Sequence, residues 1–77
     1  MKTKALNTLL KGIGDQLAAL REKKGYTTIK QFAKHYKLPA IQYWRIERGK
    51  ANLTIKSLGR ILAIHKVSFE DFFCTFS

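Results

Sequence analysis

Residues 28–50 read TIKQFAKHYKLPAIQYWRIERGK, and this stretch decides the fold. Thr28, followed three residues later by Gln31, is a Thr-x-x-Gln capping box, which predicts that a helix begins there. Phe32, Ala33 and Tyr36 give that helix an apolar stripe. We therefore expect a first helix over about 29–37.

Pro39 separates this helix from a second one, because proline is poorly tolerated inside a helix but suits its first turn. Tyr43 and Ile46 mark the inner face of the second helix, and Gly49 is a natural stop. The spacing predicts a helix over about 39–48. Two helices of about nine residues joined by a Lys-Leu-Pro turn are typical of a helix-turn-helix motif, here at about 28–48.

Three further helices are expected outside this motif. Apolar residues at helical spacing predict one over about 8–24, although Gly12 and Gly14 weaken its first turns. Thr54 is a suitable cap for the next. Ser68, with an acid three residues later, caps a short C-terminal helix over about 68–75.

The chain is short and uninterrupted by linkers or repeats. Alternating strand patterns are absent, so residues 1–77 are expected to form one compact, five-helix, all-α domain. Cys74 is the only cysteine, which excludes an intrachain disulfide and the common zinc sites. We expect no metal and no cofactor. Without a disulfide or a signal peptide, the expected compartment is the cytoplasm.

The charge is strongly positive and unevenly distributed. Fifteen Lys and Arg oppose five Asp and Glu, which gives +10 for 77 residues. Eight of the basic residues but only one acid lie between Lys23 and Lys50. Such a surplus favours a polyanionic partner, namely DNA, RNA or an anionic membrane. A membrane is the weakest of these candidates, because the apolar runs are far shorter than the ~20 residues that a spanning helix needs.

Several segments resemble the XRE-type (Cro/phage-repressor-like) helix-turn-helix transcriptional regulators. The resemblance covers about 13–73 and is carried by Leu20-Arg21-x-x-x-Gly25-Tyr26-Thr27-Thr28, Phe32-Ala33, Arg45-Ile46-Glu47-Arg48-Gly49-Lys50, Leu58-x-x-Ile61-Leu62 and Val67-Ser68-Phe69-Glu70-Asp71-Phe72-Phe73. It implies a Cro/repressor-like DNA-binding domain of bacterial, phage or mobile-element origin. The implied function is transcription regulation, with repression as the expected effect.

The resemblance also implies a structural ion pair between Arg21 and Glu47. The alternative is two independent surface charges, which would contribute little to stability. Three positions depart from the family pattern: Lys37 stands where the turn often has glycine, Ile29 where a polar residue often opens the helix, and Leu53 where a proline is usual. Ile29 leaves only main-chain N–H groups to anchor a phosphate at that position.

In a helix-turn-helix, the second helix enters the major groove while the first crosses the DNA backbone. We expect base contacts from Ala40, Ile41, Gln42 and Arg45. We expect phosphate contacts from Thr28, Ile29, Lys30, Lys34, Trp44, Arg48 and Lys50. For Trp44 two other roles stay open, packing against the fourth helix or contacting a partner.

The C-terminal tail carries more aromatic residues than one short helix needs, which are Phe69, Phe72, Phe73 and Phe76. Some are expected to close the core and the rest to form a homodimer contact. No pattern of catalytic residues is present, so we do not expect an enzyme. The alternatives to a DNA-binding regulator are the antitoxin of a toxin–antitoxin pair with a toxin protein as partner, an RNA-binding module, or a protein-interaction module.

Overall fold

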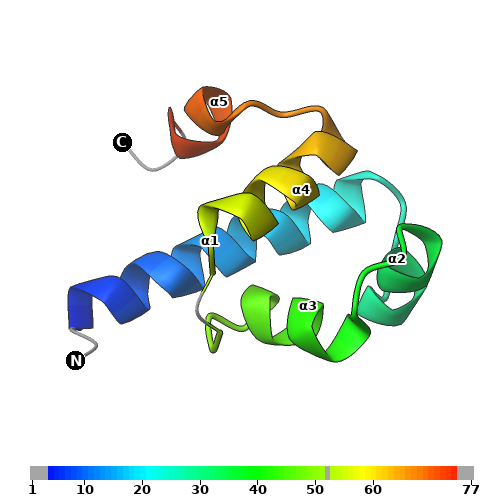
Figure 1. Cartoon of the computed structure of the whole chain (residues 1–77), viewed down its shortest axis with the longest axis horizontal. Helices are drawn as coiled ribbons and strands as arrows, with labels where there is room; N and C mark the ends of the chain where they lie inside the picture. The colour runs from blue at the N-terminus through cyan, green and yellow to red at the C-terminus, as the bar shows by residue number, and fades with distance from the viewer. Residues whose placement is uncertain (1–3, 52, 75–77) are drawn as a thin grey trace.

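A computed structural model describes residues 4–51 and 53–74, and every regular element in them is a helix. The helices are α1 (Lys4–Lys23), α2 (Ile29–His35), α3 (Ala40–Glu47), α4 (Ile55–His65) and α5 (Phe69–Cys74) (Figure 1). The expected all-α class with five helices is therefore confirmed for the described part of the chain. None of these helices is long and apolar enough to cross a membrane.

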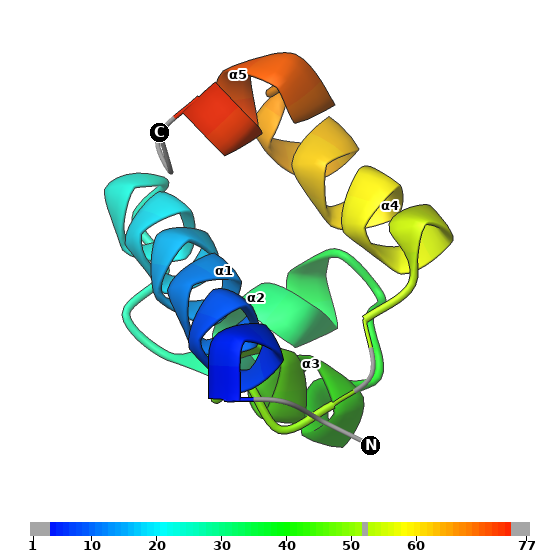
Figure 2. The same cartoon turned by 90° about the vertical axis from the view of Figure 1, so that its left-hand side faces the viewer.

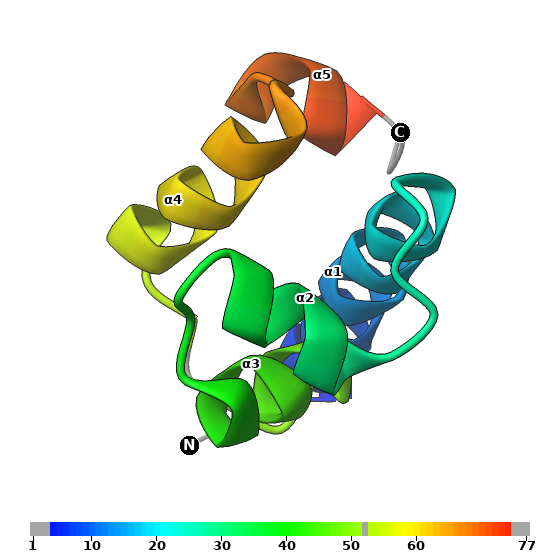
Figure 3. The ribbon, with the colours of Figure 1, turned by 90° about the vertical axis from the view of Figure 1, so that its right-hand side faces the viewer.

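The helices surround one core. Figure 2 looks nearly along α1, with α4 on the opposite side of the molecule, α5 above, and α2 and α3 below. Figure 3 shows the same arrangement from the other end. The core is formed by buried side chains from all five helices, which are Ile13, Leu17, Phe32, Tyr43, Ile46, Leu58, Ile61, Leu62 and Phe72. The Cα radius of gyration, 11.9 Å, is that of a compact protein.

The helix starts follow the expected caps. The Thr28 hydroxyl accepts from the Gln31 N–H at 3.2 Å, and the Thr54 hydroxyl accepts from the Ser57 N–H at 3.0 Å. Ser68 does the same for Asp71 at 3.0 Å. These bonds satisfy N–H groups that have no partner within the helix.

Some helix boundaries differ from the prediction. α1 begins at Lys4 instead of about residue 8, and α2 ends at His35 instead of about residue 37. The earlier end of α2 has a clear cause, because Lys37 is left-handed, with φ of 57°. Its N–H and that of Leu38 turn back to the carbonyls of Lys34 and Ala33 at 3.4 and 2.8 Å. This pattern is a Schellman motif, which usually has glycine at the left-handed position.

The glycine at position 14 has a specific packing role. A Cβ atom added to Gly14 would lie 2.3 Å from the Glu47 carbonyl oxygen and 2.7 Å from that of Ile46. Gly14 is thus the place where α1 touches the backbone at the end of α3. Gly49 adds a second close approach, since its Cβ would lie 2.9 Å from the Lys11 Cα atom. Its φ of 70° also favours glycine.

We predict that Gly14→Ala destabilises the fold by about 3 kcal/mol, because backbone atoms of α3 cannot move aside as a side chain can. The measurement is urea denaturation followed by circular dichroism. Gly59→Ala is the matched control, since it meets only the ring of Phe69, at 3.1 Å, and should change stability by less than about 1 kcal/mol. Equal effects of the two substitutions would contradict the close approach.

His65 predicts a pH dependence of stability. Its ring stacks on the buried Phe32 ring, with centroids 5.4 Å apart, and its Nε2 atom is buried with no hydrogen-bond partner among the described residues. Burial, assisted by the charge of Lys24, lowers the His65 pKa. The folded state therefore resists protonation more than the unfolded state does.

Stability should fall as the pH drops through the unfolded histidine pKa of about 6.5, and this loss should level off below the lowered folded pKa. His65→Phe keeps the stacked ring and removes the titrating group. Thermal midpoints of both proteins between about pH 8 and pH 5 measure the difference. A parallel decline in the two proteins would show that His65 does not cause it.

Candidate nucleic-acid interface

α2 and α3 are joined by a short turn at residues 36–39, and Ala33 lies under it with 1% of its surface exposed. Ala33 is thus buried, in agreement with the apolar stripe expected for this helix. The turn is also held from α4, because Arg60 Nη2 donates to the Lys37 carbonyl at 3.3 Å. The orientation of α3 is thus fixed at its start as well as at its end.

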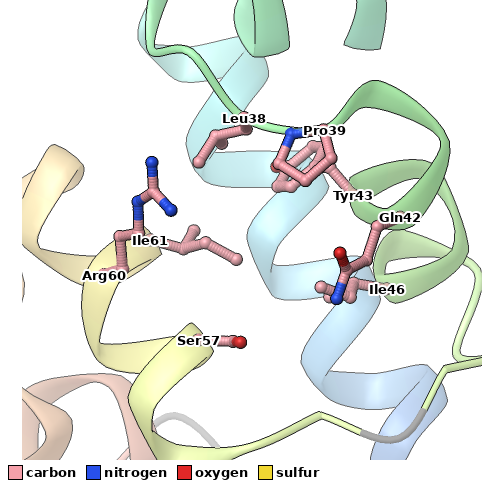
Figure 4. A pocket seen from close by; sticks show the side chains of 8 residues that line it. All are labelled: Leu38, Pro39, Gln42, Tyr43, Ile46, Ser57, Arg60 and Ile61. Atoms are coloured by element: carbon pink, nitrogen blue, oxygen red, sulfur yellow. The ribbon is translucent and has the colours of Figure 1, made fainter.

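A small cleft of about 80 Å³ lies between α3 and α4 (Figure 4). Its lining is largely apolar, and its polar side chains are Gln42, Ser57 and Arg60. Gln42 projects from α3 at the edge of the cleft, while the Arg60 guanidinium points toward the turn at Leu38 and Pro39 (Figure 4). Arg60 hydrogen-bonds the turn at Lys37, so α4 contacts the turn that precedes α3, and the cleft lies between the two helices.

α3 has a buried side and an exposed side. Tyr43, Ile46 and Glu47 are buried, whereas the predicted contact residues on the same helix are exposed, namely Ala40, Ile41, Gln42, Trp44 and Arg45. The division between the two sides therefore agrees with the helical spacing. Ile41 is 80% exposed, more than any other large hydrophobic residue described.

Two arginines near the end of α3 are oriented by local contacts. Arg45 Nη2 donates to the Lys50 carbonyl at 3.4 Å. The Arg48 guanidinium lies over the Trp44 ring, 5.0 Å from its centroid, in a cation–π contact. Trp44 remains 41% exposed, so it stays at the surface with a cation on one face.

The other predicted contact residues lie on α2 or beyond α3. Lys30, Lys34 and Lys50 are exposed cations. Thr28 is engaged as the cap of α2, and the Ile29 side chain, which is partly buried, packs against the core. These cations thus lie on α2 or just after α3, next in the chain to the helix that carries the other contact residues.

The ion pair between Arg21 and Glu47 is present and buried. Arg21 Nε donates to Glu47 Oε2 at 2.8 Å and Nη2 to Oε1 at 3.2 Å, while Nη1 donates to the Tyr26 carbonyl at 2.8 Å. The two side chains are only 7% and 6% exposed. The guanidinium therefore joins the end of α1, the following loop and the end of α3.

The pairing affects the pKa of Arg21 and of a neighbouring tyrosine. The hydrogen bond to Glu47 raises the Arg21 pKa against the opposing effect of burial. Burial is also the main cause that raises the pKa of the neighbouring Tyr43, with the Glu47 carboxylate contributing in the same direction. Arg21 therefore keeps its positive charge although it is buried.

The pair has an electrostatic consequence for the surface. Glu47 is the only acid between Lys23 and Lys50, and it is buried against Arg21. The exposed cations of this segment therefore have no exposed acid within it, and they are Lys23, Lys24, Lys30, Lys34, Lys37, Arg45, Arg48 and Lys50. Such a surplus of exposed positive charge attracts polyanions.

Sequence reasoning missed two features beside this surface. Arg60 supports the turn from α4, and the Tyr26 hydroxyl hydrogen-bonds His35 Nδ1, whose ring stacks on Tyr36 with centroids 4.6 Å apart. Both depend on how separate helices meet, which helical periodicity does not reveal. The charge of Arg60 is the one sequence signal, because it lies on an otherwise apolar stretch. Within the described residues, no three metal-ligand side chains gather into a group.

We predict that Glu47→Ala destabilises the fold by about 3–5 kcal/mol, because it leaves the Arg21 guanidinium buried without its partner. The matched control is Asp15→Ala, which breaks the Lys11–Asp15 pair at 2.6 Å, whose side chains are about 60% exposed. This second change should cost at most about 0.5 kcal/mol. Denaturant midpoints measure both, and a Glu47→Ala loss as small as the control would contradict a role for the pair in stability.

Comparison with known proteins gives no further assignment: no protein-family model, curated protein or solved structure matched this chain. The function therefore has to be argued from the residues and geometry described above.

Proposed function

We propose that this protein is a sequence-specific, double-stranded DNA-binding transcriptional regulator with a Cro/repressor-like helix-turn-helix formed by α2 and α3. The observation that carries the proposal is the surface around α3. Within residues 28–50, neutral and exposed side chains form the first turn of α3, six exposed cations lie on α2, α3 and the segments that follow them, and the one acid is buried in an ion pair. Neutral groups suit base edges, and the cations suit phosphates.

The arrangement of α2, turn and α3 supports this reading. The end of α3 is held by the close approach at Gly14 and by the Arg21–Glu47 pair, and the turn before α3 is held by Arg60 on α4, so these contacts fix which side of α3 faces outward. A docking helix needs such support, because small errors in position weaken specific contacts. In this proposal α3 enters the major groove and α2 crosses the backbone.

Each predicted contact residue then has a role. Ala40, Ile41, Gln42 and Arg45 face base edges. Phosphates are contacted by Lys30, Lys34, Arg48 and Lys50, by the Trp44 edge, and by the main chain near Thr28 and Ile29. The Arg48–Trp44 contact orients the arginine without neutralising it.

We further propose that the protein acts as a homodimer through α5. Phe72 is buried in the core, whereas Phe69 and Phe73 are 39% and 37% exposed. Phe76 lies outside the described residues. A two-fold dimer would place two α3 helices on successive turns of one DNA face. An antitoxin that binds a toxin protein through the same surface would use the same DNA-binding unit.

An RNA-binding role is less well supported by the aromatic residues. Tyr26 makes edge contacts with the Phe32 and Tyr36 rings, at 5.5 and 5.8 Å between centroids, and it is half-buried. Trp44 has Arg48 over one face. Modules for unpaired RNA instead present open aromatic faces on which bases stack.

The test is binding of the full chain to duplexes obtained by in vitro selection, and to scrambled duplexes, across a salt series. Affinity should fall steeply with salt. Arg45→Ala should lose about 1–3 kcal/mol on the selected duplex and much less on the scrambled one. Lys50→Ala should weaken both and reduce the salt slope by about one unit.

Lys66→Asn is the charge-matched control. It removes one cation at the α4–α5 turn, on the far side of the molecule from α3 (Figure 1), and asparagine tolerates the left-handed backbone there. It should leave the specific affinity almost unchanged. Absence of duplex binding at low salt, or stronger binding to single-stranded RNA, would overturn the proposed function. A selected site without two-fold symmetry would argue against the dimer.

A further inference from the structure

The first turn of α3 carries a large apolar side chain that is not buried in the core. Ile41 is 80% exposed, and its exposed neighbour Ala40 is also apolar. Leaving so much of an isoleucine in water forgoes most of the free energy that its burial would give. A binding partner that covers Ile41 would recover it.

The chemistry around Ile41 selects the kind of group that fits there. A shallow hollow on the outer side of α3 is lined by Pro39, Ile41, Gln42, Arg45 and Ala51. Three of these side chains are apolar, and Gln42 and Arg45 stand beside them as hydrogen-bonding groups. On base edges in the major groove, the apolar group is the C5 methyl of thymine.

Arg45 adds a hydrogen-bonding group beside the apolar side chain of Ile41. It lies one turn after Ile41 on the same side of α3, and one of its nitrogens is tethered to the Lys50 carbonyl. The tether restricts the guanidinium while leaving other N–H groups free to donate. Guanine O6 and N7 are the acceptors that an arginine fork matches best.

We infer that Ile41 and Arg45 together read a thymine methyl group and a guanine in each half-site, an inference that rests on the proposed DNA-binding function. The two residues are separated by four positions, or about 6 Å along the helix axis. Successive base pairs are about 3.4 Å apart along the DNA axis, to which a helix in the major groove is inclined, so the thymine and the guanine lie within about two base pairs of each other.

The test uses the duplex obtained by selection with the full chain. Each thymine is replaced in turn by uracil, which removes only the methyl group. At one thymine position per half-site, this change should weaken wild-type binding by about three- to tenfold. Replacement of a guanine within about two base pairs of that thymine with 7-deazaguanine should also weaken binding, because it removes the N7 acceptor.

The decisive measurement is the coupling between protein and DNA changes. Ile41→Ala should bind the thymine and uracil duplexes equally, whereas wild type should distinguish them. Because Ile41 is exposed, this substitution should leave the denaturation midpoint unchanged. Ile55→Ala is the matched control, since Ile55 is 70% exposed on α4, and it should retain full discrimination.

The outcomes separate this inference from the function on which it rests. Salt-dependent duplex binding with no uracil effect coupled to Ile41 would overturn the inference and leave DNA binding intact. A uracil effect that persists in Ile41→Ala would also overturn it, because another residue would then contact the methyl group. Failure to bind any duplex would remove the proposed function and this inference together.

Discussion

The contact between α1 and the end of α3 is the constraint on which the rest of the structure depends. Gly14 allows the two backbones to touch. The Arg21–Glu47 pair joins the same two helices nearer the C-terminal end of α1. Once this edge of α3 is fixed, helical geometry alone decides which residues face outward. The buried position of Glu47 and the exposed position of Ile41 are two results of one contact. The same contact removes a negative charge from the surface around α3.

Much of the fold was predictable from the sequence because its signals are local. The caps at Thr28, Thr54 and Ser68 depend on residues only three positions away, and the sides of α3 follow from a period of 3.6. The left-handed residues that follow the helices were only partly predictable. Glycine indicates such a residue at Gly25 and Gly49, but Lys37 and Lys66 adopt the same backbone conformation at a cost of roughly 1 kcal/mol each. Lysine gives no sequence signal for that conformation.

The unpredicted parts of the candidate site all involve contacts between separate elements. In the sequence, Gly14 is recognisable only as a weak helix former. Its packing role is evident only from the structure, in which the α3 backbone lies against it. Likewise, the spacing identifies Arg45 and Trp44 as exposed, but it does not reveal that Arg45 contacts the Lys50 carbonyl or that Arg48 lies over the Trp44 ring. The contact of Arg60 with the turn is not predictable for the same reason, since its partner is a main-chain carbonyl 23 residues away. The resemblance to the helix-turn-helix family predicts the Arg21–Glu47 pair, whereas the charge pattern alone is equally consistent with two independent surface charges.

The separation of Arg21 and Glu47 along the chain has a consequence for the order of folding. The pair closes a segment of 26 residues, whereas α2 and α3 are sequence neighbours. Loop-closure entropy therefore opposes the docking of α1 more than the pairing of α2 with α3. We expect α2 and α3 to associate early and α1 to clamp them later, in a reaction that is fast because most contacts of a small helical protein are local. The clamp that gives α3 its fixed position would then also complete the folding reaction.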